Sequence, residues 1–211
     1  SGNIDVNPMF VDTANGNYQL LASSMLINAG HPDSTDSDGT RADIGAHPYL
    51  NTYSGSTWHV SGNGNDTTGT GEGPNSFRSI QSAINFASDG DQVSVASGNY
   101  FENINFRGRS ISVIGSDGST IDGGGNGSVV TFNSGEDTNS VLRNFIIQNG
   151  LSANDGGGIY ISNSGPIIDN CIIENNISSS SGGGIYYEQT SNGSFLRNSQ
   201  VINNTANGCT G

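Results

Sequence analysis

The chain has 211 residues and a formal net charge of −13, and all six of its basic residues are arginine. The absence of lysine excludes lysine chemistry, and so few cations argue against nucleic-acid binding and against a polybasic membrane anchor. Glycine, with 32 residues, is about twice as frequent as in an average protein, and isoleucine recurs in short clusters, which favours an all-β fold over disorder. No apolar run approaches the ~20 residues of a membrane span, so we expect no membrane insertion.

An acidic cluster lies in the first fifty residues. Asp33, Asp36, Asp38 and Asp43 bring four carboxylates into a short stretch, and Gly39 allows a tight turn between them. Carboxylate oxygens are ligands that calcium prefers, so calcium is the one cofactor that the sequence suggests, and no organic cofactor is indicated. The spacing is not that of an EF-hand, and a solvated acidic turn is the alternative interpretation.

One amphipathic helix is predicted, roughly from Phe77 to Ala87. Ser76 is placed to cap its start, and Gly90 follows its end. The residues that would share its apolar face are Phe77, Ile80, Ala83, Ile84 and Ala87. Alternating apolar and polar residues then predict short strands at Gln92–Val95, Asn103–Phe106, Ser110–Ile114 and Val129–Phe132.

Two motifs repeat with one shared period in the last third of the chain. The residues NFIIQN at 144–149 recur as NCIIEN at 170–175 and as NSQVIN at 198–203, at offsets of 26 and 28. The residues GGGIY at 156–160 recur at 182–186, also at an offset of 26. A unit of this size cannot bury its own apolar face, whereas stacked copies can. The sequence therefore predicts a parallel β-helix, with the single helix covering the open end of its first coil.

Stacking in this register predicts ladders of equivalent residues along the axis. Phe145, Cys171 and Ser199 would form one inward ladder, and Ile159 would stack on Ile185. Asn144, Asn170 and Asn198 would form an asparagine ladder at a bend. Just before them, Arg143, Asp169 and Arg197 place an acid between two bases, unless they are three unrelated surface charges.

Two parts of the chain resemble a known group of proteins. One part resembles the opening of right-handed parallel β-helix proteins of the pectate-lyase-like superfamily; it comprises Thr57–Val60, Gly62–Gly73, Pro74–Ile84, Gly90–Val93 and Gly98–Ile104. In that group a tryptophan strand, a glycine-rich loop, a capping helix and a first coil follow in this order. The other part looks like the closing coils of such a protein; it comprises Asn3–Asp12, Asn17–Leu20, Ile27–Gly30 and Asp36–Ala46. Met25 and His47-Pro48 depart from the pattern of those coils. The resemblance implies three parts: a closing-coil segment at 1–50, a linker with the first strand at 51–75, and a capping helix with opening coils at 76–211.

The segment that resembles closing coils stands before the segment that resembles opening coils. This order indicates either a segment of a longer array or a subunit whose last coils dock head-to-tail on the next copy. We therefore expect an extracellular or cell-surface structural or adhesive module whose partners are copies of itself or adjacent repeats of a parent chain. An arbitrary fragment of a large surface protein is the alternative.

Tyr160 and Tyr186 are predicted to stack on the outer surface, with Asp155 and Glu188 nearby. Exposed aromatic rings suit sugar rings, so a carbohydrate-binding module is the second expectation, and the resemblance also raises a polysaccharide lyase or hydrolase. The alternative is an aromatic ladder that only stabilises the sheet. The sequence shows no cluster of residues that suits catalysis, because lysine is absent and the three histidines are far apart along the chain.

Overall fold

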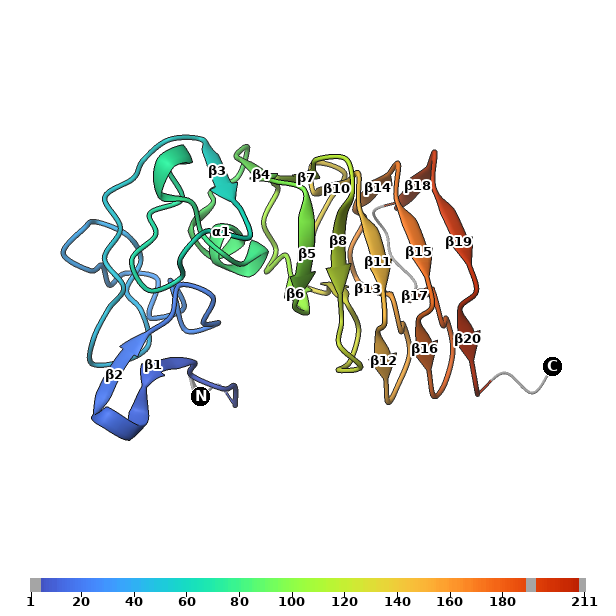
Figure 1. Ribbon diagram of the computed structural model, residues 1–211, viewed down its shortest axis with the longest axis horizontal. Helices are drawn as coiled ribbons and strands as arrows, with labels where there is room; N and C mark the ends of the chain where they lie inside the picture. Colours follow the sequence, from blue (N-terminus) through green and yellow to red (C-terminus); the bar gives the residue numbers. More distant parts are fainter. Residues whose placement is uncertain (1–4, 189–192, 209–211) are drawn as a thin grey trace.

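The structure is a computed structural model that describes residues 5–188 and 193–208. Most of the chain winds into a parallel β-solenoid of about four turns, with the N-terminal residues gathered at one end of it (Figure 1). This confirms the predicted all-β, parallel β-helix class with a single short helix. Cys209 lies outside the described residues, whereas Cys171 is a buried free thiol.

Four parallel sheets run along the solenoid, and successive coils contribute successive strands to each. The first sheet contains, in spatial order, β3 (Thr57–Val60), β4 (Gln92–Val95), β7 (Ser112–Gly115), β10 (Val141–Arg143), β14 (Ile167–Asp169) and β18 (Phe195–Arg197). The second contains β5 (Gly98–Phe101), β8 (Ser119–Asp122), β11 (Ile146–Gln148), β15 (Ile172–Glu174) and β19 (Gln200–Ile202). The third contains β12 (Leu151–Ser152), β16 (Ile177–Ser178) and β20 (Thr205–Ala206), and the fourth contains β6 (Ile104–Asn105), β9 (Val130–Phe132), β13 (Ile159–Ser162) and β17 (Ile185–Glu188).

The strands pair in the register that the repeat predicts. Ile159 pairs with Ile185, and Arg143, Asp169 and Arg197 pair in succession across β10, β14 and β18. Phe145 and Cys171 are buried, as expected for an inward ladder. Because each side-chain position repeats from coil to coil, the core is a column of stacked apolar side chains that ends at the last described coil.

The repeated glycine triplets allow neighbouring coils to approach closely. A Cβ added at Gly158 would lie 2.5 Å from the Gly184 carbonyl oxygen, and one added at Gly157 would lie 2.4 Å from the Ile177 carbonyl oxygen. Real Cβ atoms do not approach oxygen so closely, so these two positions exclude any side chain. The motif is thus a packing requirement of the solenoid.

The predicted helix is shorter than expected. The helix α1 spans Ile80–Phe86, and Ser79, rather than Ser76, caps its first turn by accepting from the Ser82 N–H. Phe77 lies outside the helix, in a parallel bridge to Val60. The backbone of Phe77 is already bonded to the strand β3 and its end: its N–H donates to the His59 carbonyl and its carbonyl accepts the Ser61 N–H, so this carbonyl is not free for a helical bond. The Asp66 carboxylate accepts the next two N–H groups, those of Arg78 and Ser79. The short 3-10 helix η2 (Gly73–Asn75) precedes this segment.

The helix α1 and the N-terminal segment together close one end of the solenoid. The strands β1 (Phe10–Asp12) and β2 (Asn17–Leu20) form an antiparallel pair around the 3-10 helix η1 (Thr13–Asn15), so they add no parallel coil. The apolar residues that follow are buried against the helix and the first coil; they are Leu20, Ala22, Leu26, Ile27 and Tyr49. The predicted strands near residues 103–106 and 110–114 are present with both bounds shifted by one or two residues, and the strand predicted at 129–132 begins one residue later and ends as predicted.

Candidate functional site

The tyrosine ladder predicted on the outer surface is present on β13 and β17. The Tyr160 and Tyr186 rings stack with centroids 5.7 Å apart and planes 9° apart. The Glu188 carboxylate lies beside them, where its Oε2 accepts from the Ser162 hydroxyl at 2.5 Å and from the Tyr160 hydroxyl at 3.4 Å. Both tyrosines are half-buried.

Asp155 completes this cluster from the loop before β13. Its Oδ1 accepts the Ser181 N–H at 2.8 Å, which links two neighbouring coils. The negative charge of Asp155, with a smaller contribution from Glu188, raises the pKa of the Tyr186 hydroxyl. The structure therefore brings all four predicted residues together. Because the rings face each other, the pair presents mainly ring edges, two hydroxyls and two carboxylates to a ligand.

The predicted charge ladder is also present. Asp169 Oδ2 lies 3.0 Å from Arg143 Nε and 3.4 Å from Arg197 Nη2, so one carboxylate joins three successive coils. A hydrogen bond from Asn198, assisted by the two guanidinium groups, holds the pKa of Asp169 below its ordinary range.

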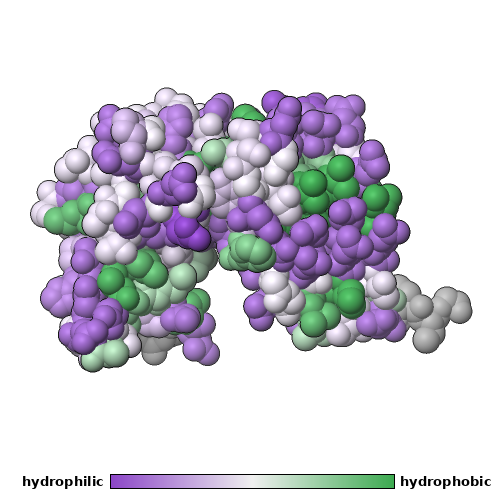
Figure 2. Space-filling view, in the orientation of Figure 1, coloured by the Kyte–Doolittle hydropathy of each residue, from purple (hydrophilic) through white to green (hydrophobic). Residues whose placement is uncertain are grey.

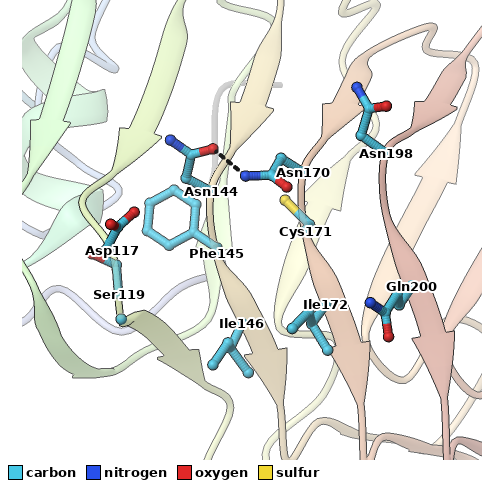
Figure 3. Close-up of a pocket in the computed structure, with 11 residues that line it drawn as sticks. Asp117, Ser119, Asn144, Phe145, Ile146, Asn170, Cys171, Ile172, Asn198 and Gln200 are labelled. Atoms are coloured by element: carbon cyan, nitrogen blue, oxygen red, sulfur yellow. Dashed lines mark hydrogen bonds between the residues drawn. The ribbon is translucent and has the colours of Figure 1, made fainter.

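The asparagine ladder runs beside these charges and borders a shallow groove (Figure 3). The Asn170 side chain donates to the Asn144 side-chain oxygen at 2.9 Å, whereas Asn198 turns instead to Asp169 Oδ1, also at 2.9 Å. The groove has a volume of about 270 Å³, and Ile146, Ile172 and Gln200 form one wall of it. The asparagines that line the groove are thus bonded within the ladder or to Asp169.

Three of the four aspartates predicted to hold calcium, Asp36, Asp38 and Asp43, accept backbone N–H groups in a turn, whereas the Asp33 carboxylate lies 3.8 Å from His31 Nδ1. Asp36 accepts from Asp43 at 2.9 Å, Asp38 accepts from Asn51 at 2.7 Å, and Asp43 accepts from Asn28 and Tyr49. Burial raises the pKa of Asp43. Within the described part of the chain, no three Asp, Glu, His or Cys side chains gather in a way that could hold a metal ion. The arrangement therefore supports the turn, and calcium at Asp33 and its neighbours stays a prediction.

Two features of the structure were not identified from the sequence. Asn176 is fully buried; its amide donates to the Ile147 carbonyl and its oxygen accepts the Gly150 N–H. The adjacent asparagine pairs at 175–176 and 203–204 were the sequence feature from which a buried asparagine could have been predicted. The second feature is a notch of about 500 Å³ between the N-terminal segment and β5, marked in the sequence only by the adjacent aromatic residues Tyr100 and Phe101.

The two ends of the solenoid differ in their exposure. On the last described coil, the inward positions Leu196 and Val201 are 48% and 44% exposed, whereas Ile168 and Ile173, one coil earlier, are 2% and 0% exposed. Ser199, predicted to continue the inward ladder, is half-buried and accepts the Cys171 N–H. Within residues 5–188 and 193–208, one end of the solenoid is therefore closed, and the other, called the open end below, exposes core residues.

None of the helices in the described part of the chain has the length and apolar character that a bilayer crossing requires. No family model, no curated protein and no solved structure matches the chain, so its fold is established by the strand geometry alone.

Proposed function

We propose that the chain is a structural or adhesive β-solenoid module that acts outside the cell or at its surface and associates end to end. The observation that supports this is the exposed end of the described coils, where Leu196 and Val201 occupy core positions and are about half exposed. Among the described residues, the strands β18, β19 and β20 are also the last members of their sheets, each paired on one edge only. Unpaired edges and exposed core residues favour pairing with a further coil.

The partner that we propose is a second copy, or an adjacent repeat, presenting its N-terminal segment. The two ends of this solenoid are different surfaces, so a contact between them is heterologous and repeats without closing. The expected product is a filament or a tandem array. We also propose that the solenoid is right-handed and of the pectate-lyase-like kind, because Trp58, the glycine-rich loop, α1 and the first coil follow in the order typical of that group.

Sedimentation velocity over a concentration series, with electron microscopy of the same samples, tests this proposal. The wild-type chain should form larger species as its concentration rises, and Leu196→Glu and Val201→Glu should remain monomeric, because a charge cannot be buried between coils. The matched control is Leu151→Glu, which changes a residue of similar exposure, 47%, on the side of the solenoid. A wild-type chain that stays monomeric throughout, or equal effects of all three variants, refutes end-to-end association.

Carbohydrate binding is the second candidate, and the cluster of Tyr160, Tyr186, Asp155 and Glu188 is the observation that favours it. The two hydroxyls and two carboxylates offer hydrogen bonds to sugar hydroxyls, and the ring edges offer apolar contact. Affinity electrophoresis in gels that contain polygalacturonate or a neutral glucan tests binding, and assays for unsaturated or reducing ends test cleavage. If Tyr160→Ala and Tyr186→Ala migrate through the glycan gel as slowly as the wild type does, these two residues do not bind the glycan.

A further inference from the structure

One strand position of the solenoid is empty at its closed end. The sheet that begins with β3 has six strands, whereas the neighbouring sheet that begins with β5 has five. The coil that carries β3 continues through η2 into α1 and contributes no strand beside β5. Consequently β5 is an edge strand with β8 on one side and the notch on the other.

The notch lies between the N-terminal segment and the first coil. Figure 2 shows it as a deep indentation at the lower edge of the molecule, between the N-terminal lobe and the coils. Leu21, Met25 and Met9 line it from the N-terminal side, and Tyr100 and Phe101 line it from the β5 side. Phe101 is 75% exposed, the highest value of any large apolar residue in the described chain. The opening is therefore an apolar slot along a strand edge.

The main chain of β5 presents hydrogen-bonding groups to this slot. The Glu102 N–H donates to the Asp122 carbonyl in β8, so residues 98, 100 and 102 bond toward β8. In a parallel ladder, alternate residues bond to opposite sides, so the N–H and C=O groups of Asn99 and Phe101 point toward the notch. Such an edge is a template for an added strand.

The charged residues that line the notch indicate which kind of strand would bind there. Asp66 and Glu102 line the notch, and burial, with a smaller contribution from the charge of Asp66, raises the pKa of Glu102 to about 7. The one cation that lines the notch, Arg78, is bonded to the Gly62 carbonyl. Because Glu102 with this pKa is partly protonated near neutral pH, Asp66 supplies most of the negative charge that a basic side chain would meet in the notch.

We propose that this notch binds an extended peptide segment of another protein, which adds a strand to the edge of β5. Apolar residues of that segment pack against Phe101 and Met25, and a basic residue between them faces Asp66 and Glu102. The two carboxylates and the apolar slot set the sequence preference, and the main chain of Asn99 and Phe101 supplies the hydrogen bonds. This site is separate from the open end and does not depend on end-to-end association.

The test uses the full chain and a fluorescein-labelled peptide that alternates valine with arginine, titrated by fluorescence anisotropy. We expect saturable binding that Asn99→Pro weakens by about tenfold or more, because proline removes an N–H that points to the peptide. Proline is tolerated on an edge strand when its missing N–H faces away from the partner strand, so the ladder with β8 should persist. Asn99→Ala, which keeps the N–H, is the matched control and should bind as the wild type does.

A peptide that alternates valine with glutamate should bind more weakly than the arginine peptide, and Phe101→Ala should weaken the arginine peptide. If circular dichroism shows that Asn99→Pro is unfolded, the test uses the wild-type chain and two versions of the arginine peptide, each with N-methyl groups on alternate amides. If the peptide adds a strand to β5, one of these two methylation patterns must abolish binding. No saturable binding of the arginine peptide overturns the proposal. Equal binding of wild type, Asn99→Pro and both methylated peptides also overturns it, because the attraction would then be electrostatic only.

Discussion

Asparagine has two different roles in this solenoid. Asn144, Asn170 and Asn198 have φ values of 64°, 52° and 51°, and Asn149, Asn175 and Asn203 repeat this conformation at the next bend. Asparagine adopts the left-handed region more readily than other residues with a side chain, so it turns the chain at both bends. Asn176 instead lies inside the coil and satisfies backbone groups that would otherwise be buried without partners. The first role is conformational and the second is hydrogen bonding.

Asn176→Ala should destabilise the protein by about 1–3 kcal/mol, the usual cost of a buried donor or acceptor left without a partner. The variant leaves the Gly150 N–H and the Ile147 carbonyl without the amide that binds them. Urea unfolding followed by circular dichroism measures the change in the free energy of unfolding. Asn126→Ala, in an exposed turn, is the control and should change it little. Equal values for the two variants would show that water replaces the Asn176 amide.

Asp169→Asn should cost about 1 kcal/mol or less at neutral pH, because its arginine partners are 38% and 51% exposed and water screens both ion pairs. Its neighbours hold the pKa of Asp169 below the unfolded value, so this stabilisation is present above about pH 4 and is lost as the pH falls through the lowered pKa. Urea unfolding of wild type and variant across this range measures the difference, which should shrink toward acid. Asp117→Asn, an exposed turn residue, is the control, and a difference independent of pH would contradict the charge ladder.

At the scale of elements, α1 depends on two acceptors at its first turn. Glu102 reaches from the end of β5 and accepts the N–H groups of Ile80 and Gln81 at 2.8 and 3.0 Å. Asp66 accepts the two preceding N–H groups, those of Arg78 and Ser79. The helix is thus fixed to the first coil and to the loop before it by two carboxylates.

Glu102→Gln should flatten the pH dependence of stability between about pH 4.5 and 7. Burial raises the pKa of Glu102 from 4.5 to about 7, so in this window the folded protein holds a proton that the unfolded chain has released. The stability contributed by this group therefore falls as the pH rises, by about 1–3 kcal/mol. Urea unfolding at several pH values measures the slope for wild type and Glu102→Gln. Equal slopes would show that Glu102 is already ionised in the folded protein at the acid end of the window.

The elements differ in how far the sequence predicted them. The register of β10 to β19 followed from the offsets of 26 and 28, because in a solenoid one period sets the position of every repeated residue. The tyrosine and charge ladders followed for the same reason. The predicted start of α1 was wrong because the N–H and carbonyl of Phe77 bond to His59 and Ser61, a pairing that the local helical pattern does not reveal. The notch could not be predicted, since it results from a strand that one coil does not contribute.

At the scale of the whole described chain, the two ends of the solenoid differ in how their core residues are covered. At the closed end, the fully buried Asn85 joins three parts of the chain. Its amide donates to the Ala22 and Ser24 carbonyls, its side-chain oxygen accepts from Arg107 at 2.7 Å, and its carbonyl accepts from Asn28 and Arg109. These contacts bridge about sixty residues of sequence, so no local pattern predicts them. At the open end nothing comparable covers Leu196 and Val201 within the described chain.

Asn85→Ala should therefore loosen the N-terminal segment more than the coils. The Ala22 and Ser24 carbonyls lose their donor and Arg107 loses an acceptor, which should cost about 2 kcal/mol or more in a buried site. Hydrogen exchange followed by mass spectrometry should show faster exchange in residues 20–28, with little change in residues 141–178, because local opening requires less free energy than global unfolding. Gln92→Ala, an exposed position on the first coil, is the control and should leave both regions unchanged. Equally faster exchange in both regions would mean that the closing segment and the coils unfold as one unit, so that the closed end stabilises the whole column.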